Sequence, residues 1–191
     1  VYAASPAPIA EDDPLAPASP YALSKLAQEQ LALRAAREHA LDVVVTRSFN
    51  HTGPRQKPSF AAPTMARQIA LIERGTLEPV IRVGNLEAAR DLMDVRDTVR
   101  AYSALMASGA AGEVYNVATG VARPVRALLD ALVARARVPV RVETDPARLR
   151  PSDIPMLAGN PAKLQAATGW RPQVCFDQML DDLLAYWRAH P

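Results

Sequence analysis

The chain contains 191 residues, of which 49% are hydrophobic, 5% aromatic and 22% charged, and its formal net charge is +2. These values predict a folded chain with a sizeable core and exclude a disordered tail or an avid nucleic-acid binder. No apolar run approaches the length of a membrane span, so we expect a cytoplasmic protein with no membrane or nucleic-acid partner. The one cysteine, Cys175, excludes an intramolecular disulfide, and we expect its thiol to be buried.

The first predicted elements are a loop, a helix and a strand. Residues 5–20 hold five prolines and form the loop. Ser19 followed by Pro20 combines a helix N-cap with a proline at the first helical position, which predicts a helix from residue 21 to about residue 40. The apolar face of this helix is predicted from five residues: Leu23, Leu26, Ala27, Leu31 and Leu33. Residues 41–48 contain a β-branched run typical of a buried parallel strand.

A loop at residues 50–55 follows this strand, at the edge of the sheet where open α/β folds bind ligands. From there, helical and extended patterns alternate, and prolines, glycines and capping residues mark many of their ends. We predict helices at 63–74, 95–107, 124–137, 161–169 and 176–188, and extended segments at 79–83, 113–117 and 138–143. This alternation indicates the α/β class.

Tyr21 and Lys25 are the first candidate functional residues. Four positions apart on a helix, their side chains share one face. A neighbouring ammonium group favours the phenolate, so Lys25 should lower the pKa of Tyr21 from its usual value of about 10. A tyrosine tuned in this way can act as a general acid or base at a carbinol or carbonyl. By itself the pair is a weak signal, because a structural role explains an isolated match as well.

The flanking residues make the pair specific. Three segments follow one another in a fixed order: Val1-Tyr2-Ala3, Ser19-Pro20-Tyr21-Ala22-x-Ser24-Lys25-x-x-x-Glu29 and Arg47-x-x-Asn50-x-x-Gly53-Pro54. They resemble the catalytic half of the extended short-chain dehydrogenases/reductases that act on nucleotide sugars, and the resemblance extends from residue 1 to about residue 188. It implies NADPH or NADH as the cofactor, with hydride passing between the nicotinamide and C4 of the sugar.

The same resemblance implies roles for individual residues. Tyr21 would exchange a proton with O4 of the sugar, and Lys25 would hold the nicotinamide ribose and tune Tyr21. The implied cofactor-binding set is Tyr21, Lys25, Arg47, His51 and Pro54, while Asn50 would reach the sugar diphosphate. A metal site is not expected, because the other two histidines, His39 and His190, lie far from His51 in the sequence.

A further segment narrows the class of nucleotide sugar that the protein is expected to bind. It reads Gly84-Asn85-Leu86-Glu87-Ala88-x-Arg90-Asp91. It resembles the loop that GDP-mannose 4,6-dehydratases and GDP-4-keto-6-deoxymannose reductases close over their nucleotide, so Asn85, Leu86 and Arg90 would bind a GDP-linked deoxyhexose. A guanidinium group at Arg90 suits a diphosphate because it is always charged and can donate through two N–H groups. By the same resemblance, Arg150 and Asp153 would meet the diphosphate and the ribose.

Within this family the sequence favours a reductase. Residues 50–56 read Asn-His-Thr-Gly-Pro-Arg-Gln, which is similar to the reductase pattern. The implied reaction is the NAD(P)H-dependent reduction of the C4 ketone of GDP-4-keto-6-deoxy-D-mannose to GDP-D-rhamnose. A GDP-mannose 4,6-dehydratase, or another nucleotide-sugar epimerase or dehydratase, stays open. So does a non-catalytic GDP-sugar-binding remnant, because none of the eight glycines forms the glycine-rich phosphate turn of a dinucleotide-binding domain.

The resemblance also implies an architecture. Residues 1–58 and 95–118 would form the C-terminal half of a Rossmann-type parallel sheet that binds NAD(P), and residues 59–94 and 119–191 a smaller α/β substrate domain. The sequence opens on Val1 in a strand-like segment, so we expect the natural protein to include an upstream part. Without that part, this piece should be inactive and poorly stable. The helix that carries Tyr21 would contribute to a homodimer or homotetramer.

Overall fold

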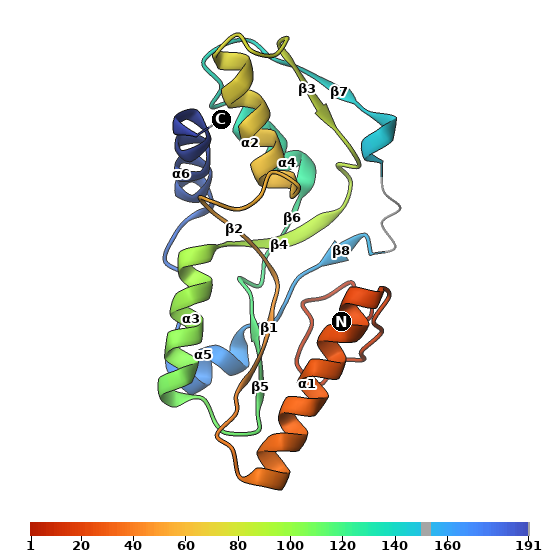
Figure 1. The fold of residues 1–191 in the computed structure, drawn as a ribbon, viewed down its shortest axis with the longest axis vertical. Helices are drawn as coiled ribbons and strands as arrows, with labels where there is room; N and C mark the ends of the chain where they lie inside the picture. Colours follow the sequence, from red (N-terminus) through yellow and green to blue (C-terminus); the bar gives the residue numbers. More distant parts are fainter. Residues whose placement is uncertain (150–153, 191) are drawn as a thin grey trace.

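The computed structural model describes residues 1–149 and 154–190, and it has the expected α/β fold (Figure 1). The helices are α1 (Pro20–His39), α2 (Ala61–Glu73), α3 (Val95–Ser108), α4 (Val125–Val133), α5 (Ala162–Thr168) and α6 (Phe176–Ala189), with a short 3-10 helix, η1 (Pro146–Arg148). The strands are β1 (Val45–Ser48), β2 (Asn50–Thr52), β3 (Val80–Val83), β4 (Ala89–Asp94), β5 (Val114–Val117), β6 (Ala122–Pro124), β7 (Arg141–Thr144) and β8 (Met156–Leu157).

The strands form three small sheets that are mostly parallel. β1 pairs with β5 in parallel, with Val45 opposite Val114, and β3 pairs with β7 in parallel. β4 is the central strand of the third sheet, where it pairs with β2 and β8 in parallel and with β6 in antiparallel orientation. A single residue, the buried Phe49, separates β1 from β2, so the chain passes directly from the first sheet to the third. Figure 1 shows β4 between the two halves of the molecule.

Four strands, β2, β4, β6 and β8, were not predicted from the sequence. β2 lies inside the predicted loop 50–55, and β4 takes up the end of the predicted nucleotide loop, so that only residues 84–88 of that segment are irregular. β6 and β8 were not predicted at all. β4 carries Arg90, Asp91 and Asp94, which break the apolar alternation of a half-buried strand. Pairing with neighbouring strands, which a local pattern does not contain, stabilises these segments.

The apolar interior has three clusters. The largest joins α2, α4, α6 and β3 at one end of the molecule. The second joins α3, α5 and β5 at the other end, and the third is a small group that contains Tyr2, Ile9, Phe49 and Ala118. Leu164 of α5 and the adjoining Trp170 are buried against α3 and β5, so part of the range 119–191 packs with part of the range 95–118. The division into two domains stays a prediction.

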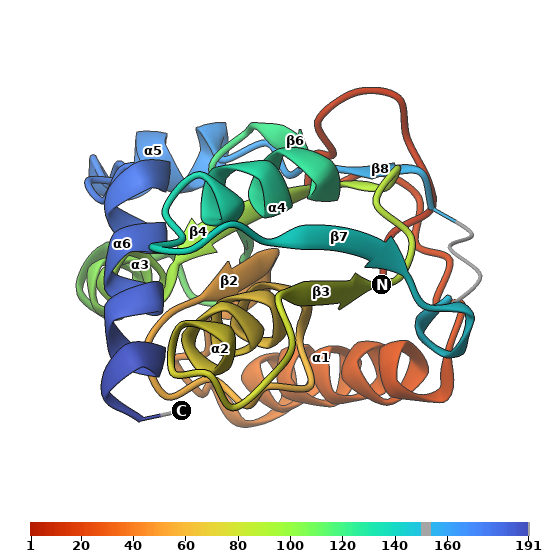
Figure 2. The same ribbon diagram turned by 90° about the horizontal axis from the view of Figure 1, so that it is seen from above.

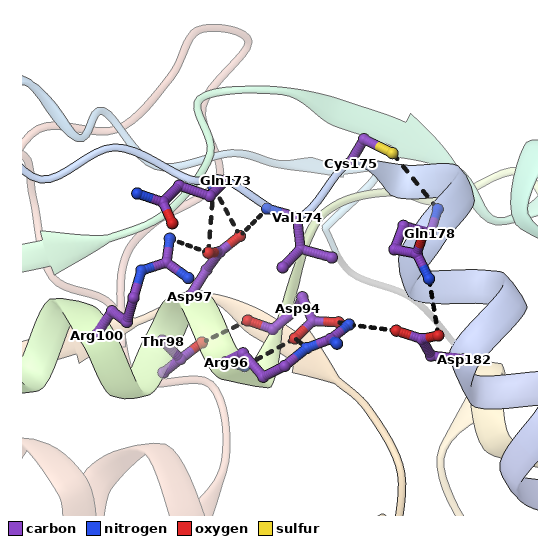
Figure 3. Close-up of polar contacts among 10 residues, drawn as sticks. All are labelled: Asp94, Arg96, Asp97, Thr98, Arg100, Gln173, Val174, Cys175, Gln178 and Asp182. Atoms are coloured by element: carbon purple, nitrogen blue, oxygen red, sulfur yellow. Dashed lines mark hydrogen bonds and ion pairs between the residues drawn. The ribbon is translucent and has the colours of Figure 1, made fainter.

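A polar cluster at the start of α3 connects the two ends of the molecule (Figure 3). The Asp94 carboxylate caps α3 by accepting from the Arg96 backbone N–H at 2.8 Å, and the Arg96 guanidinium also reaches Asp182 of α6 at 2.6 Å. The buried Asp97 carboxylate accepts from the backbone N–H groups of Gln173 and Val174. These contacts fix the approach of the chain to α6.

The expectation of a buried thiol at Cys175 is wrong. The residue is exposed at the N-terminus of α6. Its sulfur accepts from the backbone N–H of Gln178 at 3.5 Å, because the first N–H groups of a helix have no partner inside the helix (Figure 3).

α1 packs in a different way from the other helices. Figure 2 shows it on the opposite side of the molecule from α5. The predicted apolar face does not form as a unit, because Leu23 and Leu31 are 58% and 67% exposed. Among the residues of α1 only Glu29 is buried. Of the helices within the described residues, none is both long enough and apolar enough to span a membrane.

Candidate functional site

Tyr21 and Lys25 lie on the first turns of α1, as the sequence predicted. Ser19 caps the helix by accepting from the Ala22 backbone N–H at 3.1 Å, and this cap fixes the start of the helix just before Tyr21. The Lys25 ammonium lies 5.8 Å from the centroid of the Tyr21 ring and donates to Gln28 at 3.2 Å. Tyr21 is 72% exposed. The pair therefore presents a phenol and an ammonium group to the surface, where a ligand can reach both.

A cavity of about 100 Å³ lies where β2, β4 and β6 meet α2, α4 and the start of α6. Its lining contains three of the predicted residues, Asn50, His51 and Arg90, although Arg90 is far from the other two in the sequence. The parallel pairing of β2 with β4, which places Asn50 opposite Leu92, brings them together. The His51 Nδ1 lies 3.3 Å from the Phe49 carbonyl oxygen, to which it donates in the tautomer that carries the proton on Nδ1.

Arg123 is a cavity residue that the sequence reasoning missed. It lies directly opposite Arg90 in the antiparallel pairing of β6 with β4. The guanidinium carbon of Arg123 lies 4.8 Å from the centroid of the Phe176 ring. The Arg90 guanidinium is partly buried, and this burial lowers the pKa of Arg90. Two like charges on opposing strand positions repel each other, so an anion bound beside them would be stabilised. No local sequence pattern identifies Arg123, because its position opposite Arg90 depends on the pairing of β6 with β4.

A second and larger hollow, of about 500 Å³, lies beside the loop 84–88. Asn85 and Leu86 line it, together with Glu87 and Arg126. The loop is held in place because the carbonyl oxygens of Leu86 and Ala88 accept from the first backbone N–H groups of α4. It also passes so close to η1 that a Cβ atom at Gly84 would collide with the carbonyl group of Arg148. Arg150 and Asp153, the remaining predicted substrate-binding residues, lie outside the described residues.

Pro54 lies on an exposed turn just after β2, whereas Arg47 lies on β1. The turn is fixed by Gln56, whose amide donates to the His51 carbonyl oxygen at 3.1 Å and accepts from the Thr52 hydroxyl at 2.7 Å. The structure thus places Asn50 and His51 at the cavity, and Pro54 on the turn between Thr52 and Gln56, which line the cavity as well. A contact of Pro54 with a cofactor stays a prediction.

The Arg47 guanidinium contacts α1 through the side chain of Glu29. It forms a two-point ion pair with Glu29, with N···O distances of 2.8 and 2.6 Å, and donates to the Tyr2 hydroxyl at 2.7 Å. Hydrogen bonding to Glu29 raises the pKa of Arg47, and burial raises the pKa of the Tyr2 phenol. The contact of Arg47 with a cofactor stays a prediction, and in the structure the Arg47 guanidinium donates to Glu29, Tyr2 and Glu11.

Comparisons with known proteins agree on one family. The model of the family described as GDP-mannose 4,6 dehydratase matches residues 2–183. The chain is 39% identical to a GDP-6-deoxy-D-mannose reductase of Pseudomonas aeruginosa, over 91% of this chain and 57% of that protein. It is 30% identical to a GDP-mannose 4,6-dehydratase of Sordaria araneosa, over 94% of this chain and 36% of that protein.

The solved structures give the same result. The structure of RMD from Pseudomonas aeruginosa complexed with NADPH aligns with a TM-score of 0.92 and 38% sequence identity, covering 96% of this chain and 61% of that one. The chain therefore spans 36% to 61% of the lengths of these relatives.

Proposed function

The chain belongs to the GDP-mannose 4,6-dehydratase family of extended short-chain dehydrogenases/reductases, and from this membership we propose that the protein reduces the C4 ketone of GDP-4-keto-6-deoxy-D-mannose to GDP-D-rhamnose with NADPH or NADH. The observation that carries the proposal is the exposed Tyr21–Lys25 pair on α1, in a fold that also gathers Asn50, His51 and Arg90 at one cavity. The similarity to a protein named as a GDP-6-deoxy-D-mannose reductase supports the reductase over the dehydratase.

The residues of the chain fit the proton chemistry of this reaction. When bound, the reduced nicotinamide supplies the hydride that the C4 carbon accepts. The ketone oxygen then becomes an alkoxide, and the Tyr21 phenol would give it a proton. The Lys25 ammonium, 5.8 Å from the centroid of the Tyr21 ring, would stabilise the resulting phenolate because the two charges are opposite. Tyr21 is exposed, so solvent can restore its proton between turnovers.

The remaining site residues fit an anionic nucleotide sugar. Arg90 and Arg123 offer two guanidinium groups from adjacent strands, and such groups bind diphosphate oxygens through paired N–H donors. Asn50 adds an amide at the same cavity. The larger hollow beside Asn85 and Leu86 is of the size that a nucleoside needs.

The reductase is tested by supplying the proposed substrate. With GDP-4-keto-6-deoxy-D-mannose, we expect the natural protein to consume one NADPH for each GDP-deoxyhexose formed, as followed by absorbance at 340 nm and chromatography. A dehydratase would instead convert GDP-mannose into the 4-keto sugar without net use of NADPH. Binding of GDP with neither reaction would identify the non-catalytic alternative and contradict the proposal.

A second test addresses the paired arginines. Arg90→Ala and Arg123→Ala should each weaken GDP binding by about 10- to 100-fold, because a charge-assisted contact with the diphosphate is lost. Isothermal titration calorimetry measures this loss, and Arg34→Ala, on the exposed surface of α1, serves as the control. Affinity that stays at the control level in both cavity variants would remove these arginines from the site.

The proposal extends to assembly and location. Leu23 and Leu31 are exposed on α1, which supports a contact between copies in a homodimer or homotetramer. We also propose that the protein is located in the cytoplasm. The two proposed domains, residues 1–58 with 95–118 and residues 59–94 with 119–191, would hold the cofactor and the nucleotide sugar respectively.

A further inference from the structure

We propose that the buried ion pair between Glu29 and Arg47 is a positioning device, which sets α1 against the sheet so that Tyr21 and Lys25 meet the substrate in one geometry. The inference rests on the proposed function, because it takes Tyr21 and Lys25 to be the catalytic pair. It gives Glu29 and Arg47 the role of positioning residues, which act on the reaction through α1.

The first observation is that the ion pair is the buried contact of an otherwise poorly buried helix. Glu29 is the only buried residue of α1, and its side chain is 6% exposed against 10% for Arg47. The two N···O distances of 2.8 and 2.6 Å show a two-point pairing between guanidinium and carboxylate. Such a pair is planar and directional, so it tolerates less sliding than apolar contact does.

The second observation is that Arg47 is itself fixed from several sides. One of its nitrogens donates to the Tyr2 hydroxyl at 2.7 Å and to the Glu11 carbonyl oxygen at 2.8 Å. The Tyr2 hydroxyl donates to the Asn116 side chain of β5 at 2.7 Å, and the Asn116 backbone N–H donates to the Glu11 carboxylate at 2.7 Å. The network therefore joins α1 to β1, to β5 and to the loop that leads into α1.

The third observation is the place of Glu29 on the helix. It lies four residues after Lys25 and eight after Tyr21, which in an α-helix means about 6 Å and about 12 Å along the axis, with successive offsets of about 40° around it. A shift or tilt at Glu29 is therefore carried directly to both side chains. Misplacement of a reacting group by about 1 Å can cost on the order of 100-fold in rate.

The experiment compares the Glu29–Arg47 ion pair, which joins α1 to β1, with an exposed ion pair that lies within α1. Arg47→Lys and Glu29→Gln remove the two-point geometry, while Arg34→Lys and Glu38→Gln make the same changes in an exposed pair that begins five residues further on. In the natural protein we expect kcat to fall by about 10- to 100-fold in the first two variants only. The KM for the nucleotide sugar should stay near that of the parent protein, since the cavity residues are not on α1.

Two further measurements separate positioning from a loss of folded protein. Amide hydrogen exchange of the free protein should become faster in α1 but not in α3 when Glu29 or Arg47 is changed. In Arg47→Ala, added guanidinium ion should restore part of kcat, because it can occupy the site of the missing side chain. Guanidinium should not raise the kcat of Arg34→Ala.

The possible failures are distinguishable. If Tyr21→Phe keeps normal turnover, the proposed function fails, whatever Glu29 does. If Tyr21→Phe is inactive while Arg47→Lys and Glu29→Gln keep parental kcat and parental exchange in α1, only the positioning role is overturned. If Arg47→Lys weakens NADPH binding and Glu29→Gln does not, Arg47 contacts the cofactor and the positioning role is likewise overturned. Should Arg47→Ala fail to fold, the charge-preserving Arg47→Lys decides the question.

Discussion

Tyr21→Phe is expected to lower kcat by roughly 1,000-fold, which lies within the usual contribution of a general acid. The change removes one hydroxyl group, and with it the proton that the nascent alkoxide at O4 requires. Little else should change, because the Tyr21 side chain is 72% exposed and its ring contributes little to the core. GDP binding should be unaffected, since the cavity arginines lie on β4 and β6. NADPH oxidation measures the rate, and calorimetry measures the affinity.

The matched control is Tyr102→Phe. Tyr102 lies on α3, where its hydroxyl forms a hydrogen bond with Ser48 at 2.7 Å, so the variant loses a tyrosine hydroxyl away from the proposed chemistry. Its kcat should stay close to that of the parent protein. Near-normal turnover in Tyr21→Phe, or an equal loss in Tyr102→Phe, would contradict the role of Tyr21 as the proton donor.

The sequence predicts the helices well because their limits depend on local chemistry. Ser19 and Pro20 mark the start of α1, and Asp94, the residue just before the predicted helix 95–107, caps α3. Predicted and observed ends differ most in α4, which ends at Val133 and not near residue 137. The strands are harder to predict. β4 contains charged residues that strand pairing and specific hydrogen bonds hold in place, and neither is visible in a local pattern.

The candidate site likewise contains some residues that the sequence identifies and others that it does not. Tyr21 and Lys25 are recognisable because they lie within one helical turn of each other, and their spacing alone puts them on one face. Arg123 has no such signal, because it meets Arg90 only through the antiparallel pairing of β6 with β4. Glu29 and Arg47 are both part of recognisable motifs, but their contact depends on how α1 packs against β1. Sequence motifs thus indicate which residues matter here, and tertiary packing decides what each of them does.

Asp91→Ala is expected to have the largest effect on stability. The Asp91 carboxylate is fully buried and accepts from the Thr119 hydroxyl at 2.7 Å, from the Thr119 and Gly120 backbone N–H groups, and from the Gly159 backbone N–H at 3.3 Å. Removing it leaves several donors without an acceptor. Each buried unsatisfied group costs about 1–3 kcal/mol, so we expect the free energy of unfolding to fall by about 3–4 kcal/mol.

Urea unfolding followed by circular dichroism measures this change, with Asp130→Ala as the control. Asp130 is an exposed carboxylate on α4, and its loss should change the free energy of unfolding by less than about 0.5 kcal/mol. Asp91→Asn should fall between the two, since its amide keeps one acceptor oxygen but turns N–H donors toward N–H donors. Because Asp91 follows Arg90 on β4, GDP binding should weaken in Asp91→Ala even where the protein is folded. Stability equal to that of Asp130→Ala would show that these hydrogen bonds do not hold β4 in place.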